Sequence, residues 1–170
     1  RRTVSAAPPR VATALPAVVQ QGDPAGLLRA ARRPVLLVGL EARDSGAPAG
    51  LQALVHRLHC PVYTSYKAKG VVGDRAEWTV GHFTGGTAEA EGIAAADLVV
   101  LCGLDPVELI GKPWPYQAPV LDIALLRHPV HYVAPAASAY GPLAPALEAL
   151  LPHAQRSDWT SDEIAALHAG

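Results

Sequence analysis

The sequence is poor in cysteine, carries no excess charge of either sign, and contains no long apolar run. Two cysteines among 170 residues supply neither a disulfide scaffold nor a zinc site, so a reducing cytoplasm is expected. Cys60 and Cys102 lie beside or inside apolar runs and are expected to be inert packing residues. Fourteen basic and fifteen acidic residues give a net charge of −1, which excludes the basic surface that nucleic-acid binding needs. The most apolar stretch, Ile93–Leu104, is interrupted by Asp97 and falls short of the roughly 20 residues of a membrane-spanning helix.

The chain also lacks methionine and begins Arg1-Arg2-Thr3. Because translation starts at methionine, we expect either a processed chain or a piece of a larger polypeptide, and we favour the piece. The first residues show no charged-then-apolar signal segment. Half of the residues are apolar and 17% are charged, which predicts a folded body rather than a disordered one.

Catalytic motifs are missing too. The sequence contains no G-x-S-x-G turn, no P-loop and no H-E-x-x-H, and no nucleophile, base and orienting partner come together, so no catalytic residue is predicted. Gly39–Gly46, after the first apolar run, is not G-x-G-x-x-G, which makes a stand-alone NAD-dependent dehydrogenase improbable. His128 and His131 have no third ligand at metal-binding spacing, so no metal site is predicted.

What is present is an alternation of apolar runs, bounded by proline or glycine, with helical patterns. Strands that are apolar throughout are typical of a parallel sheet covered on both faces. The pattern predicts a doubly wound, Rossmann-like α/β fold whose mostly parallel sheet has five or six strands and helices on both faces. The predicted strands are Val35–Gly39, Val62–Tyr66, Leu98–Gly103, Pro119–Ala124 and a weaker Val130–Val133, and the predicted helices are Pro24–Arg32, Leu51–Leu58, Thr87–Ala96 and Leu143–Leu150.

The domain boundaries follow from the same pattern. Residues 1–22 are predicted to be an N-terminal linker, residues 23–152 the domain, and residues 153–170 a linker toward a further domain. A capping-box pattern at Thr160–Glu163 predicts that this last segment can open another helix. The connection between the last two predicted strands, residues 125–129, is shorter than the dozen or so residues of a parallel crossover. Either those strands are not neighbours or one of them is wrongly placed.

Loops that follow the strands are the candidate ligand sites, because open α/β sheets bind ligands beyond the carboxyl ends of their strands. Gly81–Gly86 precedes a predicted helix, so its N–H groups could hold a phosphate, or its glycines could simply form a turn. Lys67–Gly70 could place a cation over a ligand or form a solvated loop. Asp122 could accept a ribose hydroxyl or be a satisfied strand end. The proline-rich loop at Trp114 either contacts another domain or folds onto its own core.

Six sequence segments occur in the order and spacing of a known family. Together they resemble, over about residues 22–151, the central domain of thiamine diphosphate-dependent enzymes, a group that includes acetolactate synthase, pyruvate oxidase and benzoylformate decarboxylase. The segments are Arg33–Gly39, Leu51–Leu58, Cys60–Thr64, Lys69-Gly70 with Gly81–Gly85, Ala96–Gly103 and Leu121–Ile123.

This resemblance implies that the chain is the middle of three α/β domains in an acetolactate synthase-like decarboxylase or carboligase acting on a 2-keto acid. In such enzymes the first and third domains bind thiamine diphosphate and magnesium. Their Gly-Asp-Gly…Asn segment is not found, since Gly22-Asp23 and Gly73-Asp74 are followed by Pro24 and Arg75. The chain alone is therefore expected to be inactive. The expected partners are the other domains of the same polypeptide and further copies in a dimeric or tetrameric parent, whereas the chain alone should be a monomer or weak dimer.

The resemblance also implies that this domain could bind a nucleotide, because the central domain binds FAD or ADP in some relatives. The loop after the first strand departs from their glycine-rich pattern, and Glu41 would bring negative charge near phosphates. We therefore favour an empty or vestigial site, with a regulatory FAD- or ADP-binding module that holds phosphates on residues 81–86 as the alternative. By position, the nucleotide-binding residues would be Thr64, Gly81, His82, Phe83, Gly85, Gly103, Leu104, Asp105, Asp122 and Ile123.

Overall fold

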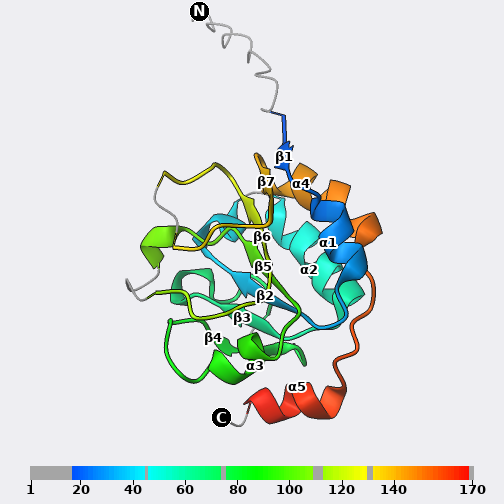
Figure 1. Ribbon diagram of the computed structural model, residues 1–170, viewed down its shortest axis with the longest axis vertical. Coiled ribbons are helices and arrows are strands. Elements are labelled where there is room, and N and C mark those ends of the chain that lie inside the picture. Colours follow the sequence, from blue (N-terminus) through cyan, green and yellow to red (C-terminus); the bar gives the residue numbers. More distant parts are fainter. Residues whose placement is uncertain (1–16, 45, 74–75, 109–112, 130–131, 169–170) are drawn as a thin grey trace, which may run out of the picture.

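A single seven-stranded sheet forms the centre of the computed structural model, which describes residues 17–44, 46–73, 76–108, 113–129 and 132–168 (Figure 1). The strand order is β1-β7-β6-β5-β2-β3-β4. β1 runs antiparallel to β7 and every other neighbouring pair is parallel, which confirms the mostly parallel α/β fold with more strands than predicted. The strands are β1 (Val19–Gln21), β2 (Pro34–Val38), β3 (Val62–Thr64), β4 (Thr79–His82), β5 (Leu98–Cys102), β6 (Val120–Ala124) and β7 (Ala137–Tyr140).

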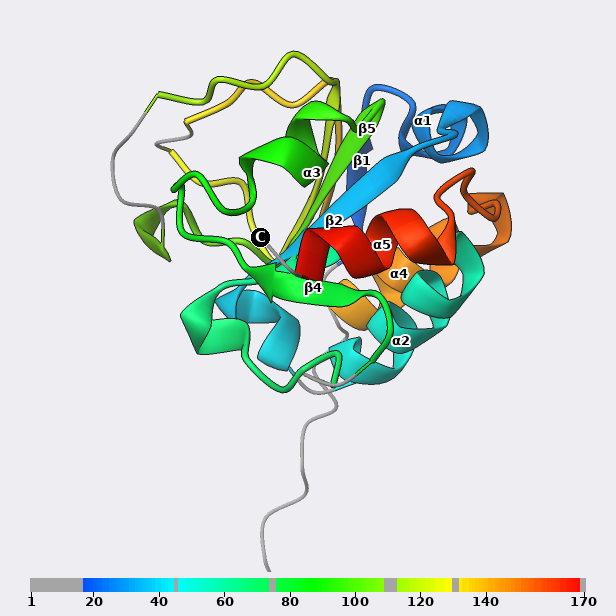
Figure 2. The same cartoon turned by 90° about the horizontal axis from the view of Figure 1, so that it is seen from below.

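The helices lie on both faces of the sheet. α1, α2 and α4 pack together on one face, whereas the short α3 and long connecting segments lie on the other (Figures 1 and 2). No helix among the described residues is both long enough and apolar enough to cross a membrane. The α-helices are α1 (Pro24–Ala30), α2 (Ala47–Leu58), α3 (Ala90–Ala94), α4 (Leu143–Leu150) and α5 (Ser161–His168), and the short 3-10 helices are η1 (Leu40–Arg43), η2 (Tyr66–Ala68), η3 (Pro106–Glu108) and η4 (Leu151–His153).

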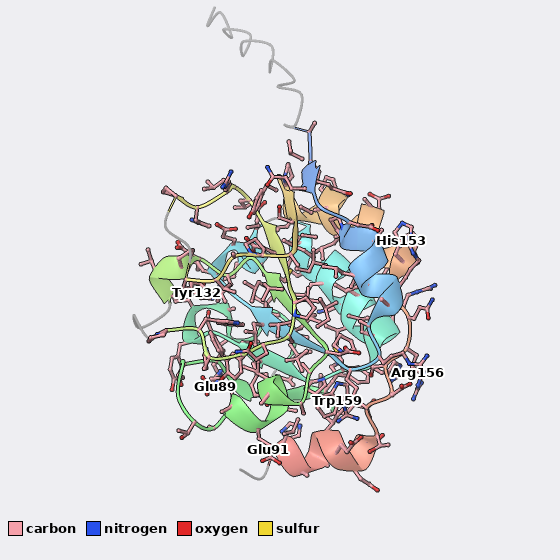
Figure 3. The ribbon with its side chains drawn as sticks, viewed as in Figure 1. Glu89, Glu91, Tyr132, His153, Arg156 and Trp159 are labelled. Atoms are coloured by element: carbon pink, nitrogen blue, oxygen red, sulfur yellow. The ribbon has the colours of Figure 1, made fainter. Side chains whose placement is uncertain are left out.

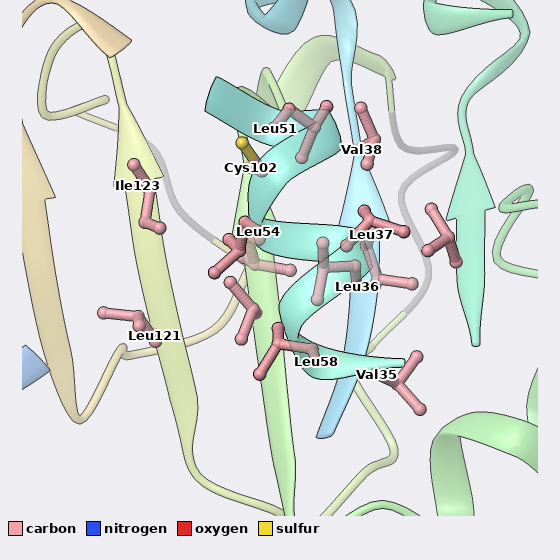
Figure 4. Packing of buried hydrophobic residues seen from close by; sticks show 14 of the residues in the cluster. Val35, Leu36, Leu37, Val38, Leu51, Leu54, Leu58, Cys102, Leu121 and Ile123 are labelled. Carbon is pink, nitrogen blue, oxygen red and sulfur yellow. The ribbon is translucent and has the colours of Figure 1, made fainter. Parts of the chain in front are cut away.

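The helix α2 shows how apolar spacing positions an element. Its leucines at positions 51, 54 and 58 are completely buried and lie over β2, beside Leu36 and Leu37 (Figure 4). Burying each such side chain contributes about 1.5–3 kcal/mol relative to leaving it exposed, so this stripe orients the helix. At α1, the predicted cap also forms: Asp23 Oδ1 accepts a hydrogen bond of 2.7 Å from the backbone N–H of Gly26.

The weak fifth strand predicted at Val130–Val133 is wrong in position. Residues 130–131 lie outside the described part of the chain, and Tyr132 and Val133 form bends rather than a strand. The strand that pairs in parallel with β6 is β7, at Ala137–Tyr140. Residues 125–136 therefore make the connection, and this length removes the conflict with a parallel crossover.

Two edge strands escaped the sequence pattern. β1 lies inside the segment 1–22 that was predicted to be a linker, and β4 lies between Lys67 and Gly86, where no strand was predicted. Both are short, and the three β1 residues are all exposed. A half-solvated edge strand needs no continuous apolar run, so neither segment carries the signal of a buried strand.

The segment after α4 is packed firmly against the body of the domain. Trp159 is buried, its Nε1 donates a hydrogen bond of 3.0 Å to the Pro34 carbonyl, and the Arg33 guanidinium lies 3.8 Å from its ring centroid. The predicted capping box is confirmed: Thr160 Oγ1 accepts from the Glu163 N–H at 3.2 Å, and the Thr160 N–H donates to Glu163 Oε2 at 2.8 Å. Residues 153–168 thus reach the amino-terminal ends of β2 and β3 and place α5 beside β4 (Figure 2).

The aromatic loop at Trp114 folds onto its own chain. The indole ring lies 5.0 Å from Tyr116, 5.5 Å from Tyr132 and 6.3 Å from Phe83, measured between ring centroids. This arrangement favours the second of the two predicted roles for the loop, packing against its own core.

Candidate functional site

The strand order places the candidate ligand site between β2 and β5. The chain continues from β2 to β3 and β4 on one side and then returns to β5 on the other side, so the topological switch point lies at the carboxyl ends of β2 and β5. Thr64, Gly103 and Asp105 and the loop at 81–85 gather along this edge. Two predicted residues do not join them: Asp122 and Ile123 lie inside β6, where both are buried.

The crevice at the switch point is closed by direct contact between its two loops. The Glu41 N–H donates a hydrogen bond of 2.9 Å to the Gly103 carbonyl. A Cβ on Gly39 would lie 2.3 Å from Leu104 Cα, and a Cβ on Gly103 would lie 2.5 Å from the Ala42 nitrogen. Gly103 also has a φ of 63°, so glycine serves here for the close approach of two backbones and not for the approach of a phosphate.

A carboxylate, that of Glu108, takes the N–H groups that a phosphate would need at this point. Glu108 Oε2 accepts from the Leu40 N–H at 2.8 Å and from the Asp105 N–H at 3.2 Å. Its other oxygen accepts from the Ser65 hydroxyl. One side chain therefore joins the loops that follow β2, β3 and β5.

A second carboxylate occupies the glycine-containing loop after β4. Glu89 is completely buried, and its Oε1 accepts from the Gly86 N–H at 2.7 Å and from the Thr84 N–H at 3.1 Å. The loop does not run directly into a helix as the sequence suggested, because α3 begins only at Ala90. Two N–H groups of the loop for which phosphate binding and a simple turn were both open are thus bound by the carboxylate of Glu89.

The other oxygen of Glu89 and the hydroxyl of Tyr63 are both buried polar atoms. Among the described residues, neither Glu89 Oε2 nor the Tyr63 hydroxyl has a hydrogen-bond partner. Burial, followed by the nearby charge of Glu89, raises the pKa of Tyr63 to about 12, so this hydroxyl keeps its proton.

A third carboxylate, Glu41, turns away from the switch point toward the loop after β6. Its Oε2 accepts from the Leu125 N–H at 2.7 Å, and its Oε1 lies 3.0 Å from Nε2 of His128. Both side chains of this pair are largely buried. The negative charge expected beside a phosphate is therefore used to fasten the β6 loop to η1.

The remaining predicted residues make structural contacts. Thr64 Oγ1 lies 3.2 Å from Nδ1 of His82, which links the ends of β3 and β4. Inside the sheet, Asp122 Oδ2 accepts a hydrogen bond of 3.0 Å from the Tyr140 hydroxyl. Burial, followed by the charge of Asp122, raises the pKa of Tyr140, so this hydroxyl stays a donor.

Large apolar side chains stand exposed along the same edge. Of the five that are exposed in the described part of the chain, four lie in the segments that follow β2, β3, β5 and β6, and the fifth, Val19, lies in the lateral edge strand β1. A groove of about 190 Å³ opens between two of them, Tyr66 and Val107. An apolar cluster of this kind on one edge is typical of a contact surface. The four residues are Leu40, Tyr66, Val107 and Leu126.

The two thiols of the chain lie in its interior. Both cysteines are free and buried, and burial raises the pKa of each thiol, that of Cys102 to about 12. Within the described ranges, no group of three His, Cys, Asp or Glu side chains is arranged to hold a metal ion. The strand order and the helices on both faces of the sheet define a Rossmann-like α/β domain.

Comparison with known proteins identifies the family. The model of the thiamine pyrophosphate enzyme central domain matches residues 23–150, so the chain belongs to this family. A solved structure from Mycobacterium smegmatis, described as a thiamin diphosphate-dependent enzyme, is similar with a TM-score of 0.61 and 24% sequence identity. The likeness covers 79% of this chain and 27% of that protein, and it shows a shared fold. The chain thus spans little more than a quarter of this relative.

Proposed function

We propose that this chain is the structural, subunit-contact domain of an acetolactate synthase-like enzyme that decarboxylates 2-keto acids or joins them to an acceptor. The observation that carries the proposal is the family match over residues 23–150, on a domain whose own edge offers packed loops in place of reactive groups. When bound, thiamine diphosphate supplies an electron sink for breaking a bond beside a keto carbon. In the proposed parent, this cofactor and Mg²⁺ belong to the other domains, and no residue of this chain contacts them.

The exposed apolar edge supports the contact role. Tyr66 and Val107 are 70% and 80% exposed, although each stands beside a buried strand end. Large apolar side chains gathered on one edge gain free energy when a neighbouring domain covers them. In the proposed parent, therefore, the carboxyl edge of the sheet faces another domain of the same polypeptide or of a second subunit in a dimer or tetramer.

We propose that no nucleotide binds at this edge. The N–H groups of Leu40, Asp105 and Gly86, which could otherwise bind the phosphates of FAD or ADP, each donate to a carboxylate of the chain. The backbones that would flank a pyrophosphate contact one another between Gly39 and Leu104. Thermal unfolding of the chain with FAD or ADP should therefore show no shift, and a rise of several degrees with either would support the nucleotide-binding alternative.

The decisive test uses the full-length parent. Its consumption of pyruvate or another 2-keto acid should require both thiamine diphosphate and Mg²⁺, while the 170-residue chain alone should show no turnover. A parent carrying Val107→Asp should assemble less completely in sedimentation, because a charge then stands on the contact edge. Val19→Asp, at an apolar position that is 57% exposed on the lateral edge strand β1, is the control. Turnover by the chain alone, or a parent indifferent to thiamine diphosphate, contradicts the proposal.

We also propose that the parent is cytoplasmic, because the two cysteines of this chain are free and buried.

A further inference from the structure

A second concave site lies at the opposite, amino-terminal edge of the sheet. Its volume is about 410 Å³, which is within the range of small-molecule sites. The segments before β3 and β4 form one wall, and the residues from Arg156 into α5 form the other. Figure 3 shows Arg156 and Trp159 together at this end of the molecule, away from Glu89 and Tyr132.

The lining of this amino-edge cavity combines apolar walls with a polar rim. Trp159 and Ile164 are buried, and Trp78 is half-buried. The Trp78 ring is held edge-on by His59, with 5.2 Å between ring centroids. Rigid aromatic and aliphatic walls of this kind suit an apolar group of a ligand.

The end of α2 places the side chain of His59 in the wall of the cavity. His59 follows the last residue of α2 with a φ of 49°, and it is the one non-glycine residue with positive φ in the described part of the chain. Glycine is the usual residue at this position of a helix end, because a Cβ is unfavourable in the left-handed region. The imidazole of His59, whose backbone has this less favourable conformation, lines the cavity.

Opposite charges face the cavity without pairing. Arg156 and Glu77 line the cavity together with His59. The charge of Arg156 lowers the pKa of the His59 imidazole, and that of Glu77 raises it. Burial is the largest effect and, with Arg156, leaves the pKa of His59 lowered, so the imidazole is neutral at pH 7. Yet among the described residues the side chains of Arg156, Glu77 and Asp162 form no ion pair with one another.

We propose that the amino-edge cavity binds a small zwitterion with an apolar body, of which a hydrophobic α-amino acid is the simplest example. The ligand carboxylate meets Arg156, its ammonium group meets Glu77 and Asp162, and its apolar group lies against Trp78 and Ile164. A ligand with only a negative charge would be attracted by Arg156 but repelled by the carboxylates of Glu77 and Asp162. A ligand with only a positive charge would leave the guanidinium of Arg156 without an ionic partner. Because the sheet and α5 contribute opposite walls, a bound ligand ties α5 to the body of the domain.

The test is calorimetric titration of the 170-residue chain with four probes. L-phenylalanine and L-leucine carry both charges, whereas 3-phenylpropionate lacks the ammonium group and 2-phenylethylamine lacks the carboxylate. Both amino acids should bind, with quenching or shift of tryptophan fluorescence, and each single-charge probe should bind at least about tenfold more weakly.

Variants of exposed arginines separate this site from non-specific binding. Arg156→Gln should weaken binding of L-phenylalanine at least about tenfold, because it removes the partner of the ligand carboxylate. Arg127→Gln removes the same charge at the carboxyl edge and should leave binding unchanged. Neither arginine side chain has a hydrogen-bond partner in the described structure, so both variants should fold, as unfolding curves will verify. Absence of binding up to about 10 mM, equal binding of all probes, or equal effects of the two variants would overturn the proposal.

Discussion

The carboxylate of Glu89 offers the sharpest test of how the carboxyl edge is held. Replacing Glu89 with alanine removes the acceptor of two backbone N–H groups, those of Thr84 and Gly86. Losing a hydrogen bond to a charged group costs about 1.5–3 kcal/mol. Because both bonds share one oxygen and the freed N–H groups can reach water, we expect a combined loss of about 2–4 kcal/mol. For a domain of this size, that loss lowers the Tm by about 5–15 °C.

Glu89→Gln is the matched control for this prediction. Its side-chain carbonyl oxygen can still accept both N–H groups, so it should lose only about 1 kcal/mol. Calorimetric and urea unfolding of the chain and its two variants give the comparison. A difference of less than about 0.5 kcal/mol between Glu89→Ala and the unmodified chain would refute the reasoning, since surface substitutions alone produce that much.

Added phosphate distinguishes a loop held by an anion from one that is merely well packed. If the N–H groups of Thr84 and Gly86 form an anion site occupied by Glu89, phosphate should raise the Tm of Glu89→Ala relative to chloride at equal ionic strength. Neither the unmodified chain nor Glu89→Gln should respond, because their loops are occupied. An equal response of all three proteins would show that phosphate acts elsewhere.

Three further predictions concern stability and reactivity. Trp159→Ala should destabilise the chain by about 3–5 kcal/mol in urea unfolding, because the indole is buried, whereas an unchanged midpoint would show that residues 153–168 pack loosely. Hydrogen bonds from the backbone and side chain of Thr160 lower the pKa of Glu163 from 4.5 to about 2. The stabilising effect of the ionised Glu163 should therefore be complete above pH 4.5 and fade as the pH falls toward 2. In the variant Glu163→Gln, the free energy of unfolding should change less between pH 4.5 and pH 2. A thiol reagent at mildly alkaline pH should label Cys60 and Cys102 only in unfolded protein, and rapid labelling of the native chain would contradict their burial.

The sequence pattern predicted strands best where every residue of the strand is buried. The runs at β2, β5 and β6 are buried at every position, and such runs fit only the interior of a parallel sheet. Prediction failed at β7, whose residues Ala137–Tyr140 include serine and small alanines that carry little signal by themselves. Burial of that segment comes from β6 on one side and α4 behind it, contacts that a local pattern does not contain.

The carboxylates at the candidate site share a sequence spacing that the sequence analysis did not recognise. Glu89, Glu108 and Glu163 each accept from the backbone N–H of the residue three positions earlier. This is half of a capping box, and the same spacing was recognised in the sequence only at Thr160–Glu163. Each carboxylate at the carboxyl edge also makes a second contact, such as that of Glu108 with Leu40. These second contacts are made to a distant loop or to a turn, whose conformation could not be predicted from the sequence.

The order and spacing of apolar runs and helical stripes by themselves determined the fold class of this protein, because each run can be buried in only one kind of layer. The resemblance of six sequence segments to a known family indicated the family, and the family model that matches residues 23–150 confirmed it. Only the tertiary structure showed that the loops after β2 and β5 contact each other and close the crevice at the switch point. That closure needs Gly39 and Gly103 to meet across β2 and β5, and it needs Glu108 to lie between their loops. The same is true of the amino-edge cavity, whose walls come from segments far apart in the chain. Distances between loops are set by how strands pair, and strand pairing is a long-range property that no local pattern encodes.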